Sequence, residues 1–149
     1  MPAGETFFVD TNVLLYSMDS SHPEKRDQAR QWLTGLWEQG TGHLSWQVLH
    51  EFYVNAERKL RVARAPARAF VESFALWRPV DMRLGLVQRG WRWMDQAQLP
   101  YWDSLIVAAA EVAGCTWLLS EDFQAGRKFG SVTVVNPFLQ TPDHFDLWS

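Results

Sequence analysis

Hydrophobic and polar positions follow two alternating patterns along the chain. Short apolar runs predict buried strands at 6–9, 43–45, 116–119 and 132–135. Longer segments carry apolar residues at helical spacing and predict helices at 24–38, 46–60, 66–77, 83–97 and 101–114. Because helices separate most of the strands, the pattern predicts an α/β fold in which helices flank a mostly parallel central sheet.

Three of the predicted helices have unusual apolar surfaces. The helix at 101–114 is apolar nearly all round, so we expect it to lie deep in the fold. The tryptophan-rich helices at 24–38 and 83–97 offer more apolar surface than one small core can bury. Since large exposed apolar patches mark contacts with other proteins, we expect a homodimer.

Acidic residues stand where two predicted strands end and where the most apolar helix begins. Asp10 follows the first strand directly, and Glu121 and Asp122 come just after the strand at 116–119. In α/β folds, ligands bind beyond the carboxyl ends of the strands. If these two strands are neighbours, their acids meet at one edge of the sheet, against which the helix that begins near Asp103 should pack.

Each acid also has a simpler interpretation. Asp10 can cap a helix that begins near Val13, and Asp103 can stabilise a first helical turn. Glu51 points away from the apolar stripe of its own helix, so the pattern alone predicts a solvated position. Glu121 and Asp122 can be turn residues. The joint placement of the acids, and not any one of them, suggests a site.

Composition limits the class of protein. The chain has 149 residues, the size of one domain, which we expect to span residues 1–149. Its net charge of −3 means that a surface for nucleic acid would have to be a local patch. The single cysteine, Cys115, fits a reducing compartment, and neither a signal sequence nor a long apolar segment is evident. These features predict a cytoplasmic protein that does not enter the membrane.

Four sequence motifs resemble, in the same order, those of the PIN-domain family. They are FFVDTNVLLYSMD, HEFYVNA, PYWDSLIVAAA and LLSEDFQAGRKFGSVTVVNPF, and the resemblance as a whole extends from Thr6 to Phe138. The resemblance is closest to VapC-type ribonuclease toxins of bacterial toxin–antitoxin pairs. It implies a PIN-like three-layer sandwich and an endoribonuclease whose products carry 5′-phosphate and 3′-hydroxyl ends. It also implies a cognate antitoxin protein, which would bind through an apolar segment.

The resemblance also implies roles for individual residues. The acidic pocket would consist of Asp10, Glu51, Asp103 and Asp122. Asp122, rather than Glu121, occupies the aspartate position of the family motif, and Asp10, Asp103 and Asp122 would bind the metal. The polar residues that support these acids or position the substrate would be Thr11, Asn12, Ser120 and Glu121.

The residue types suit a particular metal. Clustered carboxylates without convergent cysteine or histidine favour a hard cation, Mg²⁺ or Mn²⁺, as one or two ions. Such a cation can activate water and neutralise charge during hydrolysis of a phosphodiester. The four histidines are scattered without ligand spacing, which indicates surface or structural roles for His22, His43, His50 and His144.

A few basic and aromatic residues are candidates for contact with RNA. They are Arg58, Lys59, Arg61, Arg127, Lys128 and Trp102. The basic residues could follow phosphates, and Trp102, beside Asp103, could stack on a base. The alternatives are an ordinary solvated helix end for the basic residues and burial against the sheet for Trp102.

Other functional classes fit less well. A haloacid-dehalogenase-type phosphatase needs a second acid two residues after the first, where this chain has Asn12. A phospho-receiver domain needs a phosphoacceptor aspartate after a central strand, whereas Asp103 opens a helix. A non-catalytic RNA-binding module remains an alternative, since an intact set of ligands does not prove turnover.

Overall fold

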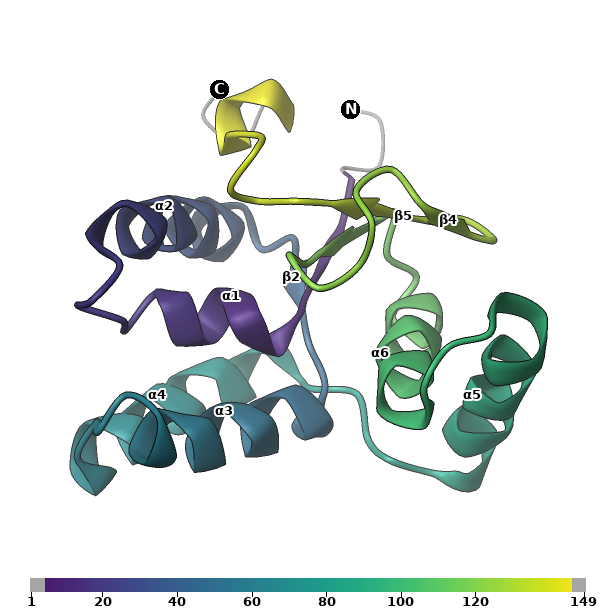
Figure 1. Ribbon diagram of the computed structural model, residues 1–149, viewed down its shortest axis with the longest axis horizontal. Coiled ribbons are helices and arrows are strands. Elements are labelled where there is room, and N and C mark those ends of the chain that lie inside the picture. The colour runs from purple at the N-terminus through teal and green to yellow at the C-terminus, as the bar shows by residue number, and fades with distance from the viewer. Residues whose placement is uncertain (1–4, 146–149) are drawn as a thin grey trace.

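A mostly parallel sheet lies at the centre of the computed structural model, which describes residues 5–145 (Figure 1). Within these residues the sheet has five strands in the order β2-β1-β3-β5-β4. The strands are β1 (Phe7–Val9), β2 (Gly42–His43), β3 (Trp117–Leu119), β4 (Lys128–Phe129) and β5 (Val132–Val135). Only β4 runs antiparallel to its neighbour β5. Residues 1–4 and 146–149 of the predicted domain lie outside the described range.

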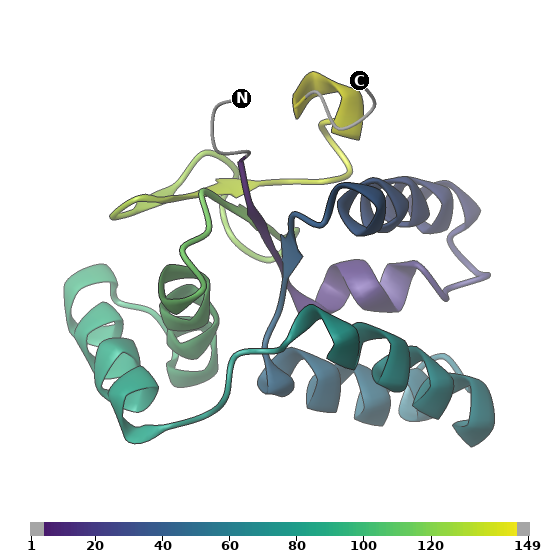
Figure 2. The ribbon, with the colours of Figure 1, turned by 180° about the vertical axis from the view of Figure 1, so that it is seen from behind.

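Helices cover both sides of this sheet, so the predicted fold class is confirmed. They are α1 (Thr11–Tyr16), α2 (Pro23–Gln39), α3 (Trp46–Arg58), α4 (Arg64–Phe74), α5 (Leu84–Ala97) and α6 (Tyr101–Val112). Figure 1 shows α1 and α2 on one side of the sheet and α5 and α6 on the other. Seen from behind in Figure 2, α3 and α4 lie side by side below α1, and both pairs, α1 with α3 and α3 with α4, are in contact.

The core explains why the most apolar segments form these elements. All three residues of β1 are fully buried, and so is most of α6 from Ser104 to Ala110. Trp32 is also fully buried and donates from its indole nitrogen to the backbone oxygen of Pro137 at 3.0 Å. The prediction that the helix after Pro100 lies deep in the fold is therefore confirmed.

Several boundaries differ from those that the sequence pattern predicts. Helix α1 begins at Thr11 and not near Val13, because Asp10 caps it. Helix α4 begins at Arg64, two residues before Pro66, and continues into a 3₁₀ turn at Ala75–Trp77. Two short elements were not predicted, β4 and a 3₁₀ turn at Pro142–Phe145. Among the described residues, no helix is long and apolar enough to cross a membrane.

The register of the central strands sets up the site. Val9 of β1 is paired with Leu119 of β3, so Asp10 and Ser120 leave adjacent parallel strands side by side. The backbone nitrogen of Asp10 also donates to the carbonyl oxygen of Leu119 at 3.0 Å. The prediction that these two strands are neighbours is thus confirmed, and their polar extensions meet at one edge of the sheet.

Candidate active site

Asp10 is both a helix cap and a member of a polar cluster. Its Oδ1 accepts a hydrogen bond from the backbone nitrogen of Thr11 at 2.7 Å, which caps α1. Its Oδ2 accepts from the hydroxyl of Ser120 at 2.8 Å, from the adjacent strand. The side chain is buried, with 6% of the residue exposed. The two interpretations of Asp10 are therefore compatible.

All four predicted acids line one cavity of about 390 Å³. Asp10 follows β1, Glu51 lies in the middle of α3, Asp103 is in the first turn of α6, and Asp122 follows β3. Their meeting depends on the parallel register of β1 and β3 and on the packing of α3 against α1. Four segments distant in sequence thus contribute carboxylates to one cavity.

The pattern-based prediction of a solvated Glu51 is wrong. Glu51 is half-buried, and its Oε1 accepts from the hydroxyl of Thr11 at 2.8 Å. Because α3 packs against α1, the face of α3 beside its apolar stripe meets the polar start of α1. This contact could not be read from the periodicity of α3 alone.

Asn12 and Ser120 connect the acids to one another. The side-chain nitrogen of Asn12 donates to Asp122 Oδ2 at 3.1 Å and lies 3.3 Å from Asp10 Oδ2. Its side-chain oxygen accepts from the backbone nitrogen of Glu121 at 3.2 Å. The hydroxyl of Ser120 in turn accepts from the backbone nitrogen of Asp122 at 3.0 Å. These bonds hold the loop after β3 against the start of α1.

The acids influence one another's ionisation. Burial raises the pKa of Asp10 to about 7; the hydrogen bonds from Ser120 and Thr11 oppose this, and the charges of Asp122 and Glu51 add to it. Burial, followed by the charge of Asp122, also raises the pKa of Asp103. The charge of Asp122 is felt by both other aspartates, as expected for carboxylates that share a cavity.

Glu121 has different partners from Asp122. It forms an ion pair with Lys25 of α2, and it accepts from the hydroxyl of Tyr16 at 3.1 Å. The ammonium group of Lys25 also lies 4.8 Å from the centre of the Tyr16 ring. Lys25 therefore balances the charge of Glu121 at the wall of the cavity, whereas Asp122 faces the other acids. Sequence reasoning missed both residues: Lys25 lies outside the four motifs, and Tyr16 lies within the first motif but was given no role.

The chemistry of this cavity fits a hard divalent cation. Its acidic side chains offer carboxylate oxygens, which Mg²⁺ and Mn²⁺ prefer, and His22, which also lines it, is paired with Asp19 at 2.8 Å. Within residues 5–145, no three His, Cys, Asp or Glu side chains lie close enough together to hold a metal ion directly. The acids instead have separate protein donors, Thr11 for Glu51 and Asn12 for Asp122. The cavity is therefore an open set of oxygen ligands and not a closed coordination shell.

A row of polar residues along α3 also lines the cavity. The row consists of Gln47, Glu51, Asn55 and Lys59, each four residues after the last. Residues at this spacing share one face of a helix. Sequence reasoning identified Glu51 and named Lys59 as a basic residue, but it missed Gln47 and Asn55. The four-residue spacing on either side of Glu51 was the signal that could have found them.

The candidate RNA contacts differ in their surroundings. All four of Arg58, Lys59, Arg61 and Lys128 are exposed, and of these Lys59 lines the cavity. Arg127 donates to the backbone oxygen of Ala97 at 2.8 Å and lies over the ring of Phe129, so its guanidinium supports the fold.

Trp102 also lines the cavity. The expectation that it is buried against the sheet is wrong, because 58% of the residue is exposed.

Comparison with known proteins agrees with this arrangement. A family model described as PIN domain matches residues 7–128, which include all four acids. The chain belongs to the PIN-domain family. A comparison with curated proteins gives no match for this PIN domain.

The PIN domain also resembles a solved structure, that of VapC20 from Mycobacterium tuberculosis, a toxin that cleaves the sarcin-ricin loop. The TM-score is 0.59 and the sequence identity 19%, and the match covers 86% of this chain and 99% of that chain. At this identity the likeness shows a shared fold.

Proposed function

We propose that this PIN domain is a metal-dependent endoribonuclease and the toxin of a toxin–antitoxin pair. The observation that supports the proposal most is the arrival of four carboxylates from four separate segments in one cavity. The likeness of the fold to VapC20, described as a toxin that cleaves the sarcin-ricin loop, supports RNA as the substrate.

The side chains of the cavity would have distinct roles in hydrolysis. Asp10, Asp103 and Asp122 would hold Mg²⁺ or Mn²⁺ partly through the ion's own water molecules, since no three acids of the described residues lie close enough together to bind it directly. The ion would supply positive charge to offset that of the phosphate. Ser120 and Thr11 keep Asp10 in position through hydrogen bonds to its two oxygens. Asn12 keeps Asp122 in position through the hydrogen bond that its side-chain nitrogen donates to Asp122 Oδ2.

Glu51 would act on water or on the ribose. Its Oε1 is fixed by Thr11, while its Oε2 has no donor among the described residues. A carboxylate held in this way can orient a water molecule, or the 2′-hydroxyl of the substrate, by accepting a hydrogen bond.

The decisive experiment is a cleavage assay on mixed cellular RNA with Mg²⁺ or Mn²⁺ and with EDTA. Cleavage that requires the cation supports the nuclease. The open arrangement of the acids favours one other candidate, a non-catalytic RNA-binding module. Binding of RNA without cleavage in either cation would establish that module instead.

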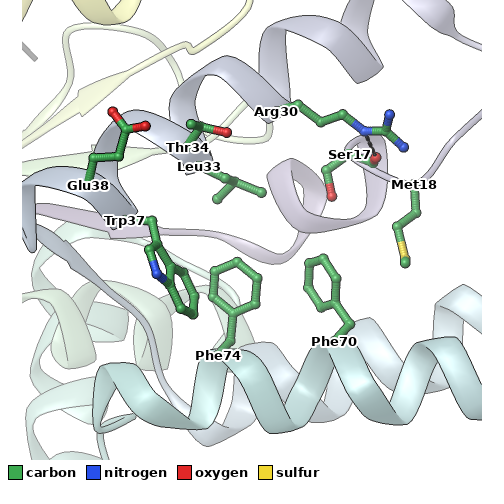
Figure 3. A pocket seen from close by; sticks show the side chains of 9 residues that line it. All are labelled: Ser17, Met18, Arg30, Leu33, Thr34, Trp37, Glu38, Phe70 and Phe74. Atoms are coloured by element: carbon green, nitrogen blue, oxygen red, sulfur yellow. Dashed lines mark hydrogen bonds between the residues drawn. The ribbon is translucent and has the colours of Figure 1, made fainter. Parts of the chain in front are cut away.

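An apolar groove of about 500 Å³ is a candidate site for the antitoxin. Figure 3 shows Trp37 and Leu33 of α2 facing Phe70 and Phe74 of α4 across it. Arg30 lies at one end, where it donates to the backbone oxygen of Ser17 at 2.8 Å. We propose that an apolar segment of the antitoxin occupies this groove. The proposal rests on the apolar lining and on the resemblance to VapC-type toxins.

Replacement of Trp37 by Glu should separate toxicity from neutralisation. Trp37 is 42% exposed in the groove, so a carboxylate there should weaken docking of an apolar segment, although it also removes the ring contacts of Trp37 with Phe74 and Trp77. We expect the variant to arrest growth as the wild type does but to be poorly rescued by a co-expressed antitoxin. Leu139→Glu, at a 75% exposed position outside the groove, should be rescued normally. Equal rescue of both variants would exclude the groove as the antitoxin site.

Helix α5 is the candidate surface for a homodimer. Leu84 and Trp91 lie on one stripe of this helix and are 66% and 50% exposed, and Met82 just before it is 43% exposed. Helix α2, by contrast, turns Trp32 into the core. The homodimer that we propose therefore uses α5 and not both tryptophan-rich helices.

The double variant Leu84→Arg/Trp91→Arg should be monomeric. Two buried charges without partners would destabilise an apolar interface, while both positions tolerate charge in the isolated chain because they are solvent-exposed. Light scattering coupled to size-exclusion chromatography gives the mass directly. The control Leu139→Arg should stay dimeric. A wild type that is monomeric at high concentration would refute the dimer.

A further inference from the structure

The cavity that holds the acids extends along α3 to a tryptophan that no role has yet explained. Trp102 and Gln47 both line it. Gln47 is nearly buried, with 8% of the residue exposed, and its Nε2 donates to the backbone oxygen of Trp102 at 3.1 Å. This bond joins the first turn of α3 to the first turn of α6, next to Asp103.

The hydrogen bond fixes which way the Gln47 amide faces. A backbone carbonyl accepts only a donor, so the NH₂ group must face Trp102 and the Oε1 must face away from it. Among residues 5–145, no group donates to this Oε1. This oxygen is not one of the buried side-chain atoms of the described residues that lack a partner, so it is accessible to solvent in the cavity, where a ligand can replace water as the donor. The position is therefore suited to a ligand that brings an N–H group.

Trp102 supplies the second element of such a site. It is 58% exposed although it is one of the largest apolar side chains. Its ring packs edge-on against that of Tyr101, with 5.1 Å between the ring centres. An indole exposed at the rim of a cavity offers a flat face on which a nucleobase can stack. Trp102, which offers the stacking face, and Gln47, which offers the open acceptor, are joined by a hydrogen bond.

We propose that Trp102 and Gln47 form a nucleobase subsite next to the acidic pocket. A base of single-stranded RNA stacks on the indole of Trp102 and donates an N–H hydrogen bond to Oε1 of Gln47. The inference rests on the proposed function, since it names the part of the RNA that this end of the cavity receives.

The opposite end of the same polar row offers a second contact for the RNA strand. Lys59, which directly follows the last residue of α3, lies twelve residues after Gln47 and lines the cavity. At a rise of about 1.5 Å per residue, the two side chains are attached about 18 Å apart. An ammonium group there suits a phosphate, whereas Gln47 and Trp102 suit a base. Glu51 lies between the two in sequence, so a strand that makes both contacts passes this acid.

Binding of short RNA tests the subsite without any need for catalysis. The probes are fluorescein-labelled single-stranded octamers of A, C and U, measured by fluorescence anisotropy in EDTA, so that no cation supports cleavage. Trp102→Ala should weaken binding by about tenfold, the effect of losing one stacked base. Trp102→Phe should keep most of the affinity because a smaller stacking face remains.

Gln47 should act on discrimination and not on stacking. Gln47→Met has a similar volume but lacks both the amide oxygen and the Nε2 that donates to the backbone oxygen of Trp102, so we expect it to reduce the affinity for the preferred octamer about fivefold. The differences between the A, C and U octamers should also shrink. Two control variants, Val112→Ala on α6 and Gln31→Met on α2, change exposed positions outside the cavity and should bind as the wild type does.

A second measurement separates this inference from the proposed function. Cut sites on mixed RNA in Mg²⁺ should show a base preference that Trp102→Ala and Gln47→Met both weaken. RNA binding that depends on Trp102 in a protein that never cleaves would support the subsite and refute the nuclease. Cleavage with unchanged binding and unchanged preference in both variants would refute the subsite and leave the nuclease standing. A wild type that binds no octamer in EDTA would also refute the subsite.

Discussion

Asp103→Asn and Asp10→Asn should each lower metal-dependent RNA cleavage by at least about 100-fold, which corresponds to about 2.7 kcal/mol in the activation free energy. Both side chains line the acidic cavity, and the charge of Asp122 acts on both. A neutral amide binds a hard cation poorly and cannot balance its charge. Initial rates on a labelled single-stranded RNA, in Mg²⁺ or Mn²⁺ and in EDTA, measure the effect.

Two control variants make this experiment specific to the pocket. Asp95→Asn removes an exposed carboxylate of α5 outside the cavity and should leave the rate unchanged. Glu121→Gln should lower the rate by less than about tenfold, because Lys25 and Tyr16 already engage Glu121 at the cavity wall. A larger loss with Glu121→Gln than with Asp122→Asn would mean that Glu121 and not Asp122 is the ligand.

The ends of the products test the mechanism independently of the variants. Attack by water yields 5′-phosphate and 3′-hydroxyl ends, whereas attack by the 2′-hydroxyl yields cyclic 2′,3′-phosphates. We expect 5′-phosphate and 3′-hydroxyl ends, which ligation and mass spectrometry distinguish from cyclic phosphates. Cyclic products, or an undiminished rate in EDTA, would overturn the metal-dependent hydrolysis proposed for this cavity.

Asp10→Asn should stabilise the metal-free protein at pH 8 by about 1 to 2 kcal/mol and should give no advantage at pH 5. Burial is the main reason that the pKa of Asp10 rises from 3.8 to about 7. At about 1.4 kcal/mol per pH unit, this difference corresponds to an upper limit of about 4 kcal/mol. The stabilisation by Asp10→Asn should be smaller than this limit, because the asparagine amide cannot accept all the hydrogen bonds that Ser120 and Asn12 give to Asp10.

The direction of the pH dependence follows from linkage. A carboxyl whose pKa is higher in the folded than in the unfolded protein binds its proton more tightly when folded. The destabilisation by Asp10 is therefore fully present above pH 7 and is relieved as pH falls from about 7 towards 3.8. The wild type should gain unfolding free energy over this range, and Asp10→Asn should lack that part of the gain. Asp103, whose pKa is also raised, contributes to the pH dependence of the unfolding free energy in both the wild type and Asp10→Asn.

Urea unfolding in EDTA at pH 5 and pH 8 measures these free energies. Asp95→Asn, the exposed control, should have the pH dependence of the wild type. Added Mg²⁺ should raise the melting temperature of the wild type more than that of Asp10→Asn, because a cation that binds only the folded state stabilises it. Identical pH dependence and identical metal response in wild type and Asp10→Asn would show that Asp10 is only a helix cap.

The sequence by itself determined those features that depend on residues close together along the chain. The apolar run before Asp10 and the all-round apolar surface at 101–114 predicted a buried strand and a buried helix, and both are present. The order of strands and helices predicted the fold class, because strands that alternate with helices form a mostly parallel sheet. The carboxylates at the strand ends could be suspected for the same reason, since such ends meet at one edge.

Only the tertiary structure decided what the side chains face. The periodicity of α3 gives the angle of Glu51 about its own helix but not the identity of the segment opposite, which proves to be Thr11 of α1. Trp102 belongs to an apolar helix and yet lies exposed at the rim of the cavity. The two-residue strand β4 is too short to carry a pattern.

The physical reason is the range of the interactions. Secondary structure follows from periodicity and capping within a few residues, which the sequence displays directly. The meeting of residues 10, 51, 103 and 122 follows from packing between segments that lie far apart in the chain. That packing buries Asp10, raises its pKa and opens a cavity along α3, and none of these effects exists in any one segment by itself.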